Sequence, residues 1–296
     1  MQLFLQTFLN SLQNIAIYSM ATIGVVLILR TSFTTNFAQG LMGTFSAFFA
    51  SNLVLYAAPQ TPFWVAIAIG ALIAFFIGFT IDAGIIRRGR GVNPFGRQMI
   101  TMGLMMIFYA VIPPMFVSIT TRTPNIPKFS YENIEFVFLG QSLYITEHAF
   151  ICVITAVIGL GILFTMLRFT KWGIALRATA ANEVVAQMMG VNTKLVTGFT
   201  WGIAGVFVAV AASSTAMALN SGMMGQVQIF CFLACVLGGV TSFWAPIAGC
   251  ALIPLFLNYS AVFSPKWAVL ISFILIMLII LVRPNGIFGK KFIRKV

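Results

Sequence analysis

Long hydrophobic runs without charge dominate the chain. No charged residue precedes Arg30, the next is Asp82, and residues 98–121 are again free of charge. Between residues 195 and 282 the one charged residue is Lys266. A membrane-spanning helix needs about 20 consecutive apolar residues, so this last region accommodates roughly four spans. The pattern predicts spans at about 9–29, 40–57, 62–86, 98–120, 148–168, 196–216, 226–243, 246–263 and 266–283.

The composition supports the same interpretation. Of the 296 residues, 60% are hydrophobic and 7% are charged, whereas soluble domains have about 25% charged residues. So few charges could not cover the surface of a soluble fold. We therefore expect an all-α, polytopic transmembrane bundle of eight or nine spans, forming a single domain over residues 1–296.

Basic residues are concentrated between the predicted spans and predict the topology. Fourteen of the seventeen belong to a few groups: Arg30; Arg87, Arg88, Arg90 and Arg97; Arg168, Lys171, Arg177 and Lys194; and Arg283, Lys290, Lys291, Arg294 and Lys295. Loops rich in Lys and Arg remain cytoplasmic, where they contact lipid headgroups. The clusters thus predict an external N-terminus and a cytoplasmic C-terminus. The formal net charge of +12 reflects this topology and not a nucleic-acid site.

The longest predicted external segment, about residues 121–147, contains three of the five acidic residues: Glu132, Glu135 and Glu147. It is expected to form a small extracytoplasmic cap with a short hairpin. Its acids are either solvated or in contact with a soluble partner on that face.

Residues suited to catalysis are scarce, so we expect no catalytic residues and no metal site. The single histidine, His148, is interpreted as an interfacial residue, and the four cysteines fall in hydrophobic segments without metal or disulfide spacing. Asp82 is the one acid within a predicted span, close to Arg87. We interpret it as a helix-end charge that pairs with arginine, and an ion relay is the alternative. Asp82→Asn should be nearly silent in the first case and severe in the second.

Amides and glycines interrupt two of the apolar segments. "NFAQGLMG" contains Asn36, Gln39, Gly40 and Gly43, and a weakly similar segment, "LNSGMMGQVQIF", contains Asn220. Glycine permits close backbone approach, and a broken helix can direct backbone dipoles at a solute. These five residues are candidates for a solute pathway, and helix packing by small residues is the alternative. A further interruption, "LGGVTSFWAPIAG" (237–249), predicts a turn between spans.

A short amphipathic helix is predicted between Arg177 and Lys194. Its apolar stripe is formed by Ala181, Val184, Val185, Met188 and Met189, and Asn182, Glu183 and Gln187 face away from it. Thr179 is the expected N-cap and Gly190 the expected end. The charge pattern places this helix in the cytoplasm, where it either rests on the membrane or docks into a groove of a soluble partner.

The segment that contains this helix resembles a known family. "TKWGIALRATAANEVVAQMMGVNTKLVTGFTWGIAGVFVAVAA" is similar to the cytoplasmic loop and following span of permease subunits of branched-chain amino-acid ABC transporters. The shared pattern, T-x-x-G-x-A-x-R-A followed by G-[IV]-N, corresponds to Thr170, Gly173, Ala175, Arg177, Ala178, Gly190, Val191 and Asn192. "NFAQG" resembles the family's N-F-A-H-G, with Gln39 in place of histidine, and "RPNGIFG" resembles R-P-x-G-[IL]-[FL]-G. The motifs extend the resemblance over most of the chain.

The resemblance implies a permease subunit in a bacterial plasma membrane that imports branched-chain or other hydrophobic amino acids. Its implied partners are a second permease chain (identical or related), two cytoplasmic ATPase subunits that use ATP and Mg, and an extracytoplasmic substrate-binding protein. The chain itself would be no enzyme and would hold no cofactor. Within a coupling loop at about 169–195, the implied ATPase contacts are Arg177, Ala181, Asn182, Glu183, Val184, Val185, Met188, Met189 and Gly190.

Other functions remain compatible with the residues. One alternative is an ABC permease for urea or short amides. A different class is a stand-alone ion-coupled transporter or channel, and a third is a membrane scaffold that transports nothing.

Overall fold

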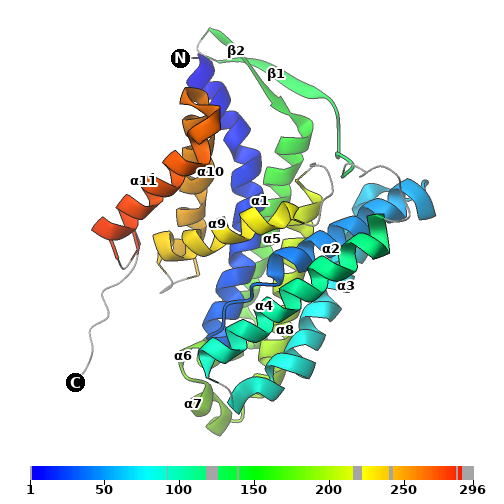
Figure 1. Ribbon diagram of the computed structural model, residues 1–296, viewed down its shortest axis with the longest axis vertical. Helices are drawn as coiled ribbons and strands as arrows, with labels where there is room; N and C mark the ends of the chain where they lie inside the picture. The colour runs from blue at the N-terminus through cyan, green and yellow to red at the C-terminus, as the bar shows by residue number, and fades with distance from the viewer. Residues whose placement is uncertain are drawn as a thin grey trace.

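The computed structural model describes residues 2–91, 93–117, 126–138, 140–215, 222–239, 243–284 and 286–288 (Figure 1). The helices are α1 (Gln2–Ser32), α2 (Gln39–Asn52), α3 (Phe63–Ile81), α4 (Pro94–Ile112), α5 (Glu147–Phe169), α6 (Lys171–Ala181), α7 (Glu183–Met188), α8 (Thr193–Ser213), α9 (Met223–Gly238), α10 (Ala245–Phe263) and α11 (Ala268–Val282). Strands β1 (Asn133–Phe138) and β2 (Gln141–Thr146) form one hairpin. Single π-helical turns extend α2 at 53–57, α3 at 82–86 and α4 at 113–117.

Eight helices in the described part of the chain are long and apolar enough to cross a membrane. The expectation of an all-α polytopic bundle is therefore confirmed. The segment predicted at 226–243 is a shorter helix, α9, of 16 residues. It ends at Gly238 because Gly239 takes a positive φ of 97°, which glycine adopts without steric cost. Helix α10 begins at Ala245, so the two helices are separate where a turn is predicted, and residues 240–242 of that turn lie outside the described part.

Helix α8 lies at the centre of the bundle and packs against α1, α2 and α3. Its backbone approaches the neighbouring helices closely because small residues face each other. A Cβ at Gly205 would meet the carbonyl of Ala74 in α3, and one at Gly43 in α2 would meet the carbonyl of Val208. Close contact between small residues is the usual means of helix association in lipid, where the hydrophobic effect does not drive helices together.

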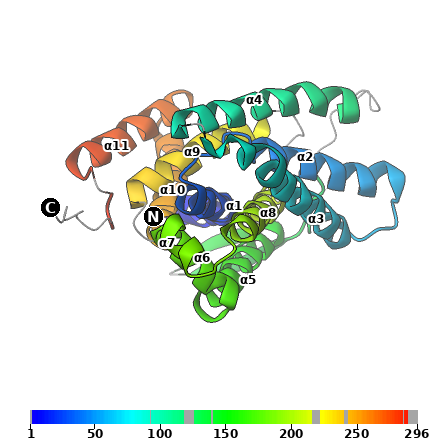
Figure 2. The ribbon, with the colours of Figure 1, turned by 90° about the horizontal axis from the view of Figure 1, so that it is seen from below.

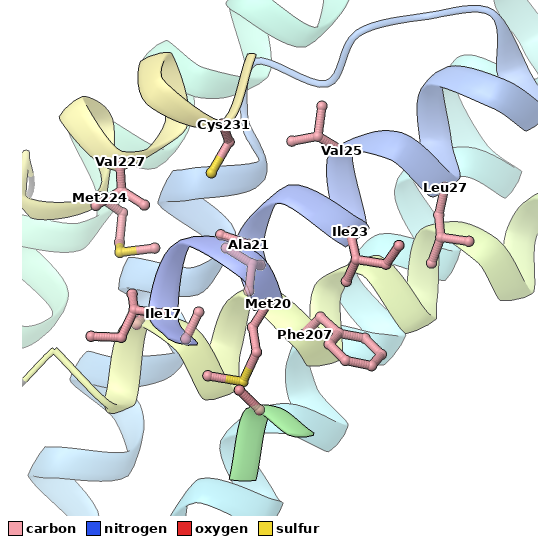
Figure 3. Close-up of a cluster of buried hydrophobic side chains, with 14 of the residues drawn as sticks. Ile17, Met20, Ala21, Ile23, Val25, Leu27, Phe207, Met224, Val227 and Cys231 are labelled. Carbon is pink, nitrogen blue, oxygen red and sulfur yellow. The ribbon is translucent and has the colours of Figure 1, made fainter. Parts of the chain in front are cut away.

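The largest apolar core is built around α1. Figure 3 shows Met20, Ile23 and Leu27 of α1 together with Phe207 of α8 and Met224 of α9, all of them buried. A hydrogen bond also joins α1 to α8, because the buried Trp201 indole Nε1 donates to Ser32 Oγ at 3.1 Å. The core thus fixes the last turn of α1 against the middle of α8.

The hairpin lies at the same end of the bundle as the N-terminus, and α6 and α7 lie at the opposite end (Figure 1). Asn133 pairs with Thr146 in an antiparallel register, and Gln2 Nε2 donates to the Ser142 carbonyl. The hairpin predicted within residues 121–147 is therefore confirmed, while residues 121–125 lie outside the described part.

The basic clusters that precede α9 meet at the α6–α7 end. Arg97 Nη1 donates to the carbonyl of Ser32 at the end of α1, and Arg87 Nη2 donates to the carbonyl of Lys194 at the start of α8. Glu132 and Glu135 lie on the hairpin or beside it. Basic side chains thus gather at the α6–α7 end, while Glu132 and Glu135 lie at the hairpin end. Which end faces the cytoplasm stays a prediction.

Candidate coupling and translocation sites

A sharp turn connects the α5 span to α6. Thr170 caps α6, since its Oγ1 accepts the backbone N–H of Gly173 at 3.1 Å. A Cβ at position 173 would collide with the carbonyls of Met166 and Leu167. Glycine is therefore required where α6 turns back against the end of α5. This explains in physical terms two residues of the motif in the 170–178 segment.

The predicted single helix around residue 181 is wrong in its boundaries, because Asn182 divides the segment into α6 and α7. Asn182 is extended (φ −160°, ψ 112°), and its Oδ1 accepts the N–H groups of Val184 and Val185. Asn182 is therefore the N-cap of α7. Thr179, the predicted N-cap, is buried inside α6 and its hydroxyl donates to the Ala175 carbonyl.

Gly190 ends α7 as predicted. Its φ is 81°, its N–H donates to the Gln187 carbonyl, and the N–H of Val191 donates to the Ala186 carbonyl. This pair of bonds is a Schellman motif, which satisfies the last carbonyls of a helix. Both ends of this six-residue helix are therefore capped, which fixes a helix too short to be stable alone.

The apolar stripe of α7 is exposed. Met188 and Met189 are 80% and 79% exposed, and Val184 and Val185 are 59% and 53% exposed. The polar side is bonded to the start of α8 instead: Gln187 Nε2 donates to Thr193 Oγ1, and Thr193 Oγ1 donates to Glu183 Oε1. The helix therefore presents a rigid apolar surface outward and is tied to α8 by its polar side.

Arg177 and Ala181 belong to α6 and not to the stripe of α7. Both line a groove of about 700 Å³ at this end of the bundle, together with Arg30 and Arg168. Of the nine residues predicted to contact an ATPase, these two are thus placed apart from the other seven, which all lie on α7 or its caps.

Buried amides surround the N-terminus of α2. Asn36 Oδ1 accepts the N–H of Ala38, and Gln39 Nε2 donates to the Ala21 carbonyl of α1 at 3.0 Å. Gln39 is 1% exposed, and its Oε1 has no hydrogen-bond partner among the described residues. An unpaired buried carbonyl is costly and calls for an explanation.

The N-terminus of α9 meets this same region. Gly40 lies against the Met224 carbonyl and Gln228 of α9, and Gln228 Nε2 donates to the Asn36 carbonyl at 3.4 Å. The described parts of the two similar segments are thus brought together, and from there α9 crosses α1 while α2 extends away from it (Figures 1 and 2). We call Asn36, Gln39, Gly40 and Gln228 the amide junction. Gly43 packs against Val208, and Asn220 lies outside the described residues.

Sequence reasoning missed Gln228, although an amide within a predicted span is the signal that identified Gln39. Thr101 of α4 was also missed: its hydroxyl accepts the Phe37 N–H and donates to the Thr35 carbonyl. Nothing in the sequence near Thr101 marks it, since threonine is common in membrane helices and its partners are 64 and 66 residues away.

His148, which the sequence places at a membrane boundary, is buried within the protein. Its Nδ1 accepts the N–H of Phe129, so the proton lies on Nε2, which is 3.1 Å from the Ser214 carbonyl. The ring joins the segment before the hairpin to the end of α8. Within the described residues, no three His, Cys, Asp or Glu side chains gather closely enough to hold a metal ion.

Asp82 forms the ion pair with arginine that the sequence predicts. Its Oδ2 is 2.9 Å from Arg87 Nη2 and accepts a hydrogen bond from Thr197 Oγ1 of α8 at 3.1 Å. The carboxylate is buried and joins the end of α3 to the start of α8. We therefore no longer expect Asp82→Asn to be silent in an ATP-driven importer. The carboxylate holds α3 against α8 whether or not the protein is driven by ions.

Asp82→Ala should lower the stability of the protein by about 2 kcal/mol, because it leaves Arg87 without its partner in a partly buried site. Thermal denaturation in detergent measures this loss, with Glu135→Ala on the exposed hairpin as a control that should change little. Equal stability of the two variants would contradict a structural role for the ion pair.

Comparison with known proteins agrees with the resemblance. Residues 7–280 match the family described as the branched-chain amino acid transport system permease component. The chain is 25% identical to the high-affinity branched-chain amino acid transport system permease protein BraD of Pseudomonas aeruginosa, over 99% of this chain and 98% of that protein. It is 26% identical to the permease protein LivH of Escherichia coli K12, over the same shares of the two chains.

A solved structure has a similar fold. PsaBC from Streptococcus pneumoniae in complex with Fab aligns over 95% of this chain and 92% of the matched chain, with a TM-score of 0.51 and 14% sequence identity. At this identity the likeness concerns the fold alone.

Proposed function

The chain belongs to the branched-chain amino acid transport system permease family, and we propose on this premise that it is the permease subunit of an ABC importer for branched-chain or other hydrophobic amino acids. The observation that carries this proposal is the capped, outward-facing apolar stripe of α7. Such a surface can dock into an apolar groove of a soluble partner.

In this proposal α7 receives the movement of an ATPase subunit and transfers it to α8. Glu183 and Gln187 tie α7 to Thr193, the first residue of α8. Helix α8 in turn packs against α1, α2 and α3. A displacement of α7 would therefore reach the centre of the bundle through packed helices, which shift between discrete arrangements rather than deform.

The two ends of the bundle would face different partners. The basic α6–α7 end would face the cytoplasm, where two ATPase subunits use ATP and Mg. The N-terminus and the hairpin would face outward towards a soluble substrate-binding protein. A second permease chain, identical or related, would complete the pathway in a bacterial plasma membrane.

The amide junction is the proposed solute contact within this chain. Two helix N-termini carry partial positive charge and can bind an anionic group such as a carboxylate. The unpaired Gln39 Oε1 offers an acceptor for an ammonium group in the same region. A zwitterionic amino acid has both groups. Urea and short amides have neither charge and remain the alternative solutes.

Gln39→Leu should impair uptake more than stability. The leucine side chain has a similar volume, and it removes both the unpaired oxygen and the hydrogen bond from Nε2 to the Ala21 carbonyl. Loss of that one bond should change folding by about 1 kcal/mol. The apparent KM for the solute should rise roughly tenfold, as expected for the loss of a hydrogen bond to a charged group. Asn52→Leu, at the far end of α2, is the matched control and should leave the KM unchanged.

Reconstitution tests the proposal as a whole. The chain is placed in proteoliposomes with its ATPase subunits, second permease chain and binding protein, and uptake of radiolabelled leucine and urea is measured. We expect leucine uptake that requires ATP and persists when ionophores collapse the ion gradients. Uptake without ATP that ionophores abolish would instead identify an ion-coupled transporter, and ATP-dependent uptake of urea alone would identify the other solute class.

A further inference from the structure

The groove beside α6 gathers three arginines from three different helices. It is lined by Arg30 from the last turn of α1, Arg168 from the end of α5 and Arg177 from the middle of α6. Its volume is about 700 Å³, and Phe243 and Trp244 from the segment before α10 form its other wall. No acidic residue lines it in the described part of the chain.

The arginines lack the acidic partners that would neutralise them. Arg30 is half-buried, and its guanidinium stacks on the Phe243 ring, 4.3 Å from the ring centroid. The ion pair between Asp82 and Arg87 is the one found among the described residues, so none of the three groove arginines has one. Three like charges around one groove favour an anion there. The other two arginines are exposed and free to turn towards an anion, whereas the half-buried Arg30 gains most from a counter-charge, because its guanidinium is partly withdrawn from water.

The walls of the groove are apolar and adjoin the exposed side of α5. Phe164 and Trp244 stack with centroids 3.6 Å apart, and Trp244 is 64% exposed. On the same helix, one exposed face of α5 is formed by residues spaced three or four apart: Ile158, Ile162, Thr165 and Phe169. Exposed aromatic rings at a helix end are typical of the boundary between headgroups and acyl chains. A hydrocarbon chain on this stripe would have its polar end at the arginines.

We propose that this groove binds one anionic phospholipid, whose phosphate contacts Arg30, Arg168 and Arg177 while an acyl chain lies along α5 beside Trp244. Arginine binds phosphate through paired hydrogen bonds, and basic pockets between membrane helices on the cytoplasmic side are suited to anionic headgroups. The lipid would join α1, α5 and α6 to the start of α10. This proposal concerns a lipid site and does not depend on which solute is transported.

Native mass spectrometry tests the site directly. The purified chain, stripped of lipid in detergent, is titrated with phosphatidylglycerol or phosphatidylcholine of the same acyl chains. We expect one phosphatidylglycerol to be retained, with an affinity at least about tenfold higher than that for phosphatidylcholine. Arg30→Gln, Arg168→Gln and Arg177→Gln together should remove this preference.

A second triple variant, Arg88→Gln, Lys171→Gln and Lys194→Gln, is the matched control. It removes the same charge from exposed residues at the same end of the bundle, and none of them lines the groove. This control should retain the preference. Equal loss in both variants would show general electrostatic attraction and overturn the proposal. Displacement of the lipid by excess inorganic phosphate would overturn it too, since the groove would then take a soluble anion. Displacement by leucine would also overturn it, since the groove would then bind a soluble amino acid.

Fluorescence quenching provides a measurement that needs no arginine variant. Phosphatidylglycerol or phosphatidylcholine with brominated acyl chains is supplied to the protein in vesicles, and Trp244→Phe identifies the contribution of Trp244. We expect brominated phosphatidylglycerol to quench this contribution more strongly. Equal quenching by the two lipids would place ordinary bilayer lipid at Trp244 and would contradict a specific site.

Discussion

Met188→Asp combined with Met189→Asp should abolish coupled transport while the protein still folds and inserts. Both side chains are about four-fifths exposed, so no contact within the chain is lost. If they fill an apolar groove of an ATPase subunit, two buried carboxylates would weaken that interface by at least about 2 kcal/mol, or roughly thirtyfold in affinity. Co-purification of a tagged ATPase subunit and stimulation of its ATP hydrolysis would both measure the loss.

Lys194→Asp is the matched control for this variant. It changes the net charge by the same two units, lies close in the sequence at the exposed start of α8, and leaves the stripe intact. An aspartate in the first turn of a helix is also favourable, so α8 should not suffer. Glu183 is left unchanged because its carboxylate accepts a hydrogen bond from Thr193. Normal ATPase association and uptake in the double-methionine variant would refute the coupling role of α7.

The spans were predictable from sequence because lipid permits few structures. Backbone groups in a bilayer must be satisfied internally, so a long apolar run without charge can hardly be anything but a helix. The end of α7 was predictable for a similarly local reason, since Gly190 occupies a conformation that disfavours other residues. The start of α7 was not, because both Thr179 and Asn182 are good N-caps and tertiary packing selects between them.

The sites that depend on tertiary contacts could be predicted only in part. Gln39 was visible as an amide in an apolar segment, but its unpaired oxygen depends on how α1 lies beside α2. His148 has a polar neighbour and a place near a span boundary in the sequence, yet Phe129 and Ser214 enclose it. The arginine groove combines residues 30, 168 and 177 with an aromatic pair near 243. No local pattern brings such distant positions together.

Gly205→Val should prevent α8 from packing against α3 and should be the most destabilising single change considered. A Cβ at this position would collide with the carbonyl of Ala74, and backbone atoms cannot yield as a flexible side chain can. The two helices would have to separate at the centre of the bundle, where α8 also contacts α1 and α2. We expect a loss of about 3 kcal/mol, measured by thermal denaturation in detergent and by the yield of monodisperse protein.

Gly161→Val separates this packing effect from the general effect of replacing a helical glycine. Gly161 lies in the middle of α5, is exposed, and has no atom within 4 Å of the position where a Cβ would be built. Both variants make the same change within a membrane-spanning helix, so they differ only in what surrounds the new side chain. The control should keep or slightly raise stability, since valine is a better helix former than glycine. If both variants lost stability equally, close contact between α3 and α8 would not be what holds the centre of the bundle together.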